Sequence, residues 1–135
     1  MLFKFRYIWF MELFTHKNLL VKDSLISGLG VFTIGDIKAG EVIEECHHIP
    51  LTQKFNETDK FLQTYLFSWP KVNARATTVV LGYGSIYNHS KDPNITWDTD
   101  EVRNIFVFKT IKDIKAGEEL CSYYGEGYEK HIKTV

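Results

Sequence analysis

The sequence predicts a mostly β domain of small curved sheets with one or two short helices. Three observations predict this class: short runs of β-branched and apolar residues recur along the chain, glycine-containing turns separate them, and no strand alternates with a long helix. A doubly wound nucleotide-binding fold is therefore not expected. A chain of 135 residues is long enough for one domain with its own core.

The first third of the chain predicts short strands joined by tight turns. The expected strands are residues 19–21, 31–34 and 42–43, and glycine turns separate them at 27–30 and 35–41.

The middle of the chain changes character. Residues 52–69 are more polar and place apolar side chains at helical spacing, so we expect a helix that Pro70 ends. Residues 77–81 predict another strand. The segments 94–97 and 102–108 predict a hairpin with its tip at 98–100.

The segment Thr33–Glu41 is repeated at Thr110–Glu118 with one difference. Two copies far apart are too few for a solenoid. We interpret each copy as a strand that leads into a bend, with an isoleucine packed inward, and assign the repeat no chemistry.

Composition limits the partners. A formal charge of −1 argues against a general nucleic-acid binder, and no apolar stretch reaches the roughly 20 residues that span a bilayer.

Glu12 interrupts the apolar N-terminus, so we expect no secretion signal, and Met11 is a plausible alternative start. Cys46 and Cys121 are expected to be reduced thiols of an intracellular protein, although one bridge stays open.

Three motifs could form a catalytic or binding site, and each one alone is weak evidence for a function. Gly28-Leu29-Gly30 lacks the third glycine of a dinucleotide site. Residues 88–94 begin Asn-His-Ser, but neighbouring side chains in a strand point to opposite faces, which disfavours a Ser-His hydrolase. The adjacent His47 and His48 with His89 make a poor zinc site. Residues 117–125 gather aromatic hydroxyls near the C-terminus.

Together, in this order, the three motifs resemble the SET domain of protein-lysine methyltransferases, and the short stand-alone SET proteins (those of large algal DNA viruses included) above all. Residues 88–94 match the Asn-His-Ser-x-x-Pro-Asn signature, and residues 117–125 match the Gly-Glu-Glu-Leu…Tyr-Gly segment. The resemblance implies a SET domain at 19–128, an N-terminal extension at 1–18 and a tail at 129–135. It also implies a C-terminal pseudoknot.

The resemblance implies methyl transfer from S-adenosylmethionine to the ε-amine of a protein lysine, on a histone tail. A histone substrate implies a nuclear chromatin regulator. Tyr124 matches the catalytic tyrosine, and Tyr65 and Tyr128 match lysine-channel tyrosines. No metal is implied. The implied cofactor-binding residues are Gly28, Leu29, Gly30, Ser85, Ile86, Asn88 and His89.

Departures from the pattern leave a second reading open, in which a catalytically weak SET module binds lysine-containing peptides. Leu29 stands where short relatives carry an aromatic residue, and the cysteine cluster that follows many SET domains is missing. A homodimer partner or the bound peptide could then close the channel.

Acidic residues could attract a basic tail or form a solvated rim: Glu44, Glu45, Asp98, Asp100 and Glu101. A nucleic-acid-binding β-domain is the third and weakest reading.

Overall fold

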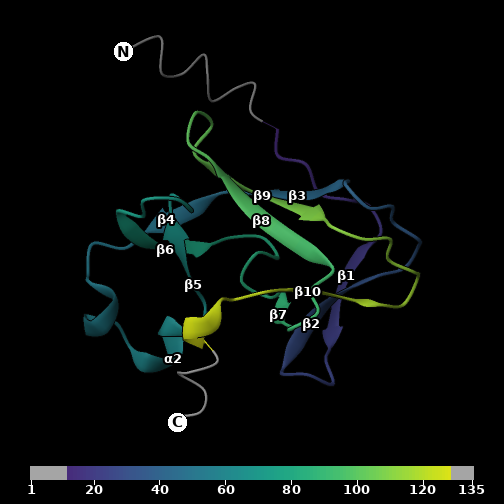
Figure 1. Cartoon of the computed structure of the whole chain (residues 1–135), viewed down its shortest axis with the longest axis horizontal. Coiled ribbons are helices and arrows are strands. Elements are labelled where there is room, and N and C mark those ends of the chain that lie inside the picture. Colours follow the sequence, from purple (N-terminus) through teal and green to yellow (C-terminus); the bar gives the residue numbers. More distant parts are fainter. Residues whose placement is uncertain (1–11, 129–135) are drawn as a thin grey trace.

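The computed structural model describes residues 12–128, and its strands form three small sheets (Figure 1). The first has the order β1 (Leu19–Asp23), β2 (Leu29–Thr33), β10 (Glu119–Ser122), β7 (Asn88–His89). The second has the order β3 (Val42–Cys46), β9 (Ile105–Thr110), β8 (Ile95–Asp100). The third has the order β4 (His48–Pro50), β6 (Ala76–Val80), β5 (Leu66–Trp69). Two short helices, η1 (Phe55–Glu57) and α2 (Lys60–Gln63), precede β5. The mostly β prediction is confirmed.

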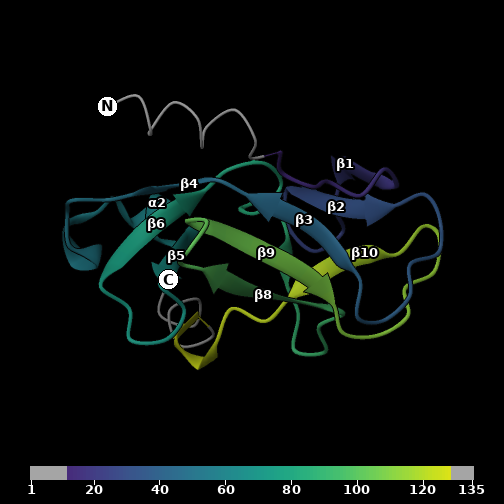
Figure 2. The same cartoon turned by 90° about the horizontal axis from the view of Figure 1, so that it is seen from above.

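The β3-β9-β8 sheet lies between the other two, as the turned view shows (Figure 2). Its central strand β9 supplies Phe106 and Phe108, which have no exposed surface. Phe67 of β5 packs edge-on against both rings, and Tyr87 lies over Phe108. These aromatic contacts join the sheets into one core.

The strand β10 brings the end of the chain into the first sheet. It pairs antiparallel with β2 and parallel with β7, although β7 lies some thirty residues earlier. The two motifs at Asn88-His89 and at 117–125 therefore become neighbours through backbone pairing.

The two copies of the repeat bind each other reciprocally. Ile37 and Ile114 are buried, as predicted, and each backbone N–H donates to the carbonyl of the other at 2.8 Å. The Asp36 carboxylate accepts from the Ala116 N–H and the Asp113 carboxylate accepts from the Ala39 N–H, both at 2.9 Å. The repeat is thus a symmetric clasp between the first and last parts of the domain.

Two predicted elements are wrong in detail. The helix expected over 52–69 is limited to η1 and α2, because β5 begins at Leu66 and pairs with β6. The hairpin tip lies at 101–104 and not at 98–100, because Asp98 to Asp100 continue the pairing with β9. Both cysteines are buried and free, which confirms the prediction of reduced thiols.

Several predictions concern the chain ends. The extension up to residue 11, Met11 as a start and the tail at 129–135 lie outside the described residues. Within the described part, Phe14 and His16 already hydrogen-bond to β3. Across residues 12–128 no helix is long and apolar enough to cross a membrane.

Candidate active site

Most of the predicted cofactor residues surround one cavity of about 620 Å³, which we call the glycine-loop cavity. The glycine loop is residues 24–30, and four of its members line this cavity. The full lining is Ile26, Ser27, Gly28, Leu29, Phe61, Thr64, Tyr65, Ser85, Ile86, Asn88, His89, Tyr124 and Tyr128. The sequence motifs therefore converge in space, although they lie far apart in the chain.

The two glycines of the first motif have different reasons to be glycine. Gly28 has a φ of +46°, a backbone conformation that side chains disfavour. Gly30 has no positive φ and does not line the cavity, but a Cβ there would lie 2.2 Å from Oε1 of Glu119. Gly30 thus makes room for a side chain of β10.

Asn88 connects β7 to the glycine loop. Its amide nitrogen lies 3.2 Å from the Ser27 carbonyl, 3.0 Å from the Leu29 carbonyl and 2.7 Å from Oε1 of Glu119. All three neighbours are acceptors, so the amide presents its nitrogen to them. Asn88 therefore shapes the loop that lines the cavity.

His89 connects β7 to the C-terminal aromatic residues. Its Nδ1 accepts the backbone N–H of Tyr124 at 3.1 Å. The rings of Tyr123, Tyr124 and Tyr128 lie within 5.1 to 5.4 Å of the imidazole, centroid to centroid. His89 thus sets the backbone position of Tyr124.

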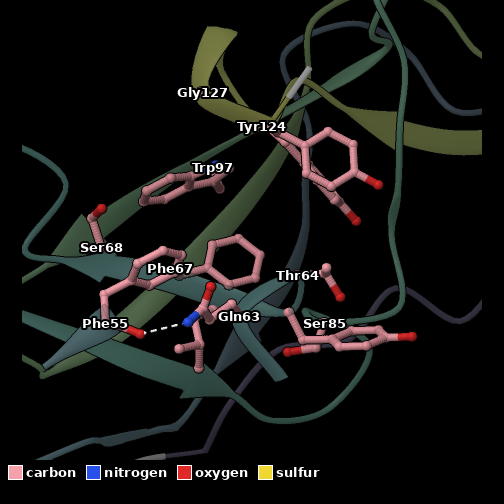
Figure 3. A pocket seen from close by; sticks show the side chains of 12 residues that line it. Phe55, Gln63, Thr64, Phe67, Ser68, Ser85, Trp97, Tyr124 and Gly127 are labelled. Atoms are coloured by element: carbon pink, nitrogen blue, oxygen red, sulfur yellow. Dashed lines mark hydrogen bonds between the residues drawn. The ribbon is translucent and has the colours of Figure 1, made fainter. Parts of the chain in front are cut away.

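A second cavity of about 320 Å³, which we call the aromatic cavity, shares lining residues with the first and is drawn in Figure 3. Figure 3 shows Trp97, Phe67 and Tyr124 around the same space. Among the described residues, the lining has no charged side chain: Phe55, Gln63, Thr64, Tyr65, Leu66, Phe67, Ser68, Ser85, Trp97, Tyr124, Gly127 and Tyr128. Phe55, Phe67 and Trp97 were not predicted as site residues, because none of them lies in one of the three motifs.

The two cavities have part of their lining in common. The shared residues are Thr64, Tyr65, Ser85, Tyr124 and Tyr128. The three tyrosines are those that the sequence predicted as catalytic or as channel residues. Tyr124 and Tyr128 lie edge to face with their ring centroids 4.7 Å apart. Ligands in the two cavities would therefore both contact these tyrosines.

The Tyr124 hydroxyl donates to the backbone carbonyl of Tyr87. Burial, with a smaller contribution from Tyr128, raises the pKa of Tyr124 well above its ordinary value of 10.0. The hydroxyl of Tyr87 in turn donates to Oε1 of Glu44 at 2.9 Å, and the Tyr83 N–H donates to Oε2 at 3.0 Å. A buried carboxylate thus supports the residue whose carbonyl orients Tyr124.

Of the five acidic residues that the sequence suggested as a rim or an attracting surface, Glu44 does not belong to the surface. Glu44 is 2% exposed, so the expectation that it attracts a basic tail is wrong. Arg103 pairs with Glu45 at 2.5 Å and with Asp100 at 2.8 Å. Arg75 pairs with Glu101 at 2.9 Å. Three of the five carboxylates therefore pair with an arginine, whereas Asp98 is exposed and accepts the Thr99 N–H.

Within the described residues, His47, His48 and His89 do not form a metal site with other side chains. His48 is buried, stacks 4.0 Å from the Trp69 ring and hydrogen-bonds to Thr78 and Asn104, whereas His47 is exposed. Between residues 12 and 128 no three His, Cys, Asp or Glu side chains are grouped to hold a metal ion.

The glycine-loop cavity fits S-adenosylmethionine in size and chemistry. Small-molecule sites measure roughly 300–1,000 Å³, and this cavity lies in that range. The backbone of the glycine loop and His89 offer polar groups at one wall, while Tyr65 and Tyr124 offer aromatic rings that stabilise a cation. In the described part of the chain the lining contains no arginine or lysine, at Ser85 or elsewhere, so a ligand carboxylate would depend on backbone N–H groups.

Comparisons with known proteins agree on one family. The family model of the SET domain matches residues 28–125. A histone-lysine N-methyltransferase of Schizosaccharomyces pombe, specific for H3 lysine-37, is 30% identical over 109 residues, which are 78% of this chain and 72% of that protein. A crystal structure of a Plasmodium falciparum protein assigned as a histone methyltransferase superposes with a TM-score of 0.67 at 28% identity. The match covers 82% of this chain and 96% of that one.

Proposed function

The chain belongs to the SET-domain family of protein-lysine methyltransferases, and we propose that it transfers methyl groups from S-adenosylmethionine to a lysine of a histone tail. The observation that carries the proposal is the meeting of two unlike cavities at Tyr124. A two-substrate transfer needs such an arrangement, because donor and acceptor must approach from opposite sides.

The glycine-loop cavity is the proposed cofactor site. Gly28, Leu29, Ser85, Ile86, Asn88 and His89 line it, and Gly30 supports it from behind. When bound there, the cofactor supplies a methyl group on a positively charged sulfur, which a neutral amine attacks. The residues of the chain bind, orient and exclude water.

The aromatic cavity is the proposed lysine channel. A free lysine has a pKa of about 10.4 and is almost fully protonated at neutral pH, whereas only the neutral amine can attack. A lining without charged side chains disfavours the ammonium form and lowers the pKa of the bound lysine. Tyr65 and Tyr128 would flank its aliphatic stem, while Phe67 and Trp97 close the far side.

Tyr124 is the proposed catalytic residue, with an orienting role. Its hydroxyl already donates to the Tyr87 carbonyl, and its raised pKa keeps it protonated, so it is poorly suited to take the lysine proton. Its oxygen keeps a lone pair that can accept from the amine and direct it. The lysine proton then leaves to solvent before the attack.

The histone substrate follows the named activities of both relatives. Such a substrate would require the protein in the nucleus. The test is incubation of the full chain with purified core histones and methyl-labelled cofactor, followed by mass spectrometry. We expect label on a lysine of one histone, and no label when that lysine is changed to arginine. Absence of label on all histones would contradict the substrate class.

One observation favours a second candidate, the weakly catalytic module. Leu29 lines the glycine-loop cavity with 52% of its surface exposed and leaves that wall without a ring. Binding of lysine peptides without any mass gain at saturating cofactor would select this reading over the enzyme.

A further inference from the structure

We propose that Glu119 is a positioning residue that holds the glycine loop in the shape that binds the cofactor. The inference rests on the proposed function, because it assigns the loop to the cofactor. Glu119 lies in β10, does not line either cavity and has no predicted role. Its carboxylate connects three separate segments of the site.

The contacts of the carboxylate define a clamp of Ser24, Asn88, Gly30 and Glu119. The Ser24 hydroxyl donates to the carboxylate, with Oγ 2.9 Å from both oxygens. The same Oγ accepts the Ile26 N–H at 2.9 Å, and the Ser24 N–H donates to the Gly28 carbonyl at 2.8 Å. The start of the glycine loop is therefore fixed to β10.

The end of the loop is fixed through Asn88. Its amide bridges Oε1 of Glu119 and the carbonyls of Ser27 and Leu29. Hydrogen bonds to an ionised carboxylate are about twice as strong as neutral ones, so each contact with Glu119 should hold the loop more strongly than a contact between neutral groups.

The absence of a side chain at Gly30 is separate evidence for the clamp, because the Glu119 carboxylate occupies that space. A side chain at Gly30 would meet Oε1 of Glu119 at 2.2 Å and Cβ of Ser24 at 3.0 Å. Because the carboxylate lies at the end of a flexible chain, an alanine would displace it and break both of its contacts. The second glycine of the motif is thus explained by Glu119 and not by the ligand.

The neighbouring glutamate shows that the arrangement is specific. Glu118 is exposed, and its carboxylate accepts the Lys115 N–H within its own turn, at 3.3 Å. The two adjacent glutamates of the C-terminal motif therefore have different tasks, and Glu118 offers a matched control.

The clamp should govern cofactor affinity more than the chemical step. Ile26, Ser27, Gly28 and Leu29 all line the glycine-loop cavity and are exposed, so without the clamp the ligand itself must order them. Tyr124 is held separately by His89 and by the Tyr87 carbonyl.

The test compares Glu119→Ala, Gly30→Ala, the double variant and Glu118→Ala by calorimetric titration with S-adenosylmethionine. We expect each clamp variant to weaken binding about tenfold, which is the scale of one lost charge-assisted hydrogen bond. The double variant should also lose about tenfold and not a hundredfold, because both changes break one clamp. Glu118→Ala should bind like the parent, and kcat at saturating cofactor should stay within about twofold in every variant.

Three outcomes would each overturn the inference. They are an unchanged affinity in Glu119→Ala, additive losses of affinity in the double variant, and a fall in kcat without a change in affinity. Hydrogen exchange of the Ile26 amide without cofactor gives a second readout and should be faster in Glu119→Ala. If Glu119→Ala does not fold, Ser24→Ala removes one contact and should weaken binding severalfold. A parent protein that binds no cofactor would instead refute the proposed function, while the exchange experiment still decides whether the clamp orders the loop.

Discussion

At the residue scale, the Tyr124 hydroxyl is the group on which the proposed chemistry depends. It lies where the two cavities meet and donates to the Tyr87 carbonyl. The sequence motif predicted this tyrosine. It could not predict the support behind it, because Glu44 and Tyr87 lie 43 residues apart and meet only in the folded core.

Replacement of Tyr124 by phenylalanine removes the hydroxyl and keeps the ring. We expect kcat to fall about a hundredfold, the scale of one lost orienting hydrogen bond in an active site. Affinity for S-adenosylmethionine should change by less than about twofold, because the wall of the cavity keeps its shape. Rates of methyl incorporation and calorimetric titration measure the two effects.

Tyr123→Phe is the matched control, because Tyr123 is 41% exposed and lines neither cavity. Equal rates for Tyr124→Phe and the parent would refute the role of the hydroxyl.

Glu44 gives stability an unusual dependence on pH. Burial raises the pKa of Glu44 above its ordinary value of 4.5, against the donors Tyr83, Cys46 and Tyr87, which lower it. The folded state therefore binds the Glu44 proton more tightly than the unfolded state does. The resulting contribution to the free energy of unfolding is fully present below pH 4.5 and is lost as the pH rises through the raised pKa.

The free energy of unfolding of Glu44→Gln, relative to that of the parent, should therefore increase as the pH rises above 4.5. The gain should be at most about 1.4 kcal/mol per pH unit. Urea unfolding at several pH values measures it. The exposed Glu41→Gln should follow the parent at every pH, and parallel curves for Glu44→Gln and the parent would show that burial does not raise the pKa of Glu44.

At the element scale, the clasp of the two repeats joins the beginning and the end of the domain. The sequence predicted an inward isoleucine in each copy, because the pattern is local. The reciprocal contacts of Asp36 and Asp113 could not be predicted, because nothing in the pattern says that the copies meet.

Since Ile37 and Ile114 are equivalent and almost fully buried, alanine at either should cost a similar amount, about 2–5 kcal/mol. Ile34 and Ile111 are equivalent residues of the same repeat with 63% and 49% of their surface exposed. Alanine at these control positions should cost less than about 1 kcal/mol. Chemical denaturation measures all four variants, and a large difference between Ile37→Ala and Ile114→Ala would argue against a symmetric clasp.

The strand β5 shows why local spacing misled the helix prediction. Phe61 and Leu62 do lie in α2, which the Asp59 side chain caps. Four residues after the end of α2, Phe67 packs edge-on against Trp97 and Phe106 of another sheet. The segment pairs with β6 as a strand, so contacts distant in sequence decided between the helical and the strand conformation.

At the scale of the whole molecule, two cavities share the site tyrosines in their linings, and we propose one for the cofactor and the other for the substrate lysine. Nine of the thirteen residues that line the glycine-loop cavity are among the predicted site residues, whereas Ile26, Ser27, Phe61 and Thr64 are not. The aromatic cavity was predicted only at its tyrosines, because Phe55, Phe67 and Trp97 belong to elements with no motif. The arginine partners of Glu45 and Glu101 could not be predicted either, because Arg103 and Arg75 lie far from them in sequence.

This separation predicts independent effects on the two ligands. Ile26 lines only the glycine-loop cavity and Phe55 lines only the aromatic cavity, and both are about half exposed. Ile26→Ala should weaken cofactor binding severalfold and leave the KM for a lysine peptide unchanged. Phe55→Ala should do the opposite. If each variant affected both ligands equally, the two cavities would not be separate sites.

The most direct test of the two-cavity site is a crystal structure of the full chain with S-adenosylhomocysteine and a lysine peptide. We predict the cofactor product in the glycine-loop cavity against residues 27–29. The lysine side chain should lie in the aromatic cavity with its amine beside the Tyr124 hydroxyl. Binding of both ligands on one side of Tyr124, or of either ligand elsewhere, would contradict the proposed division of the site.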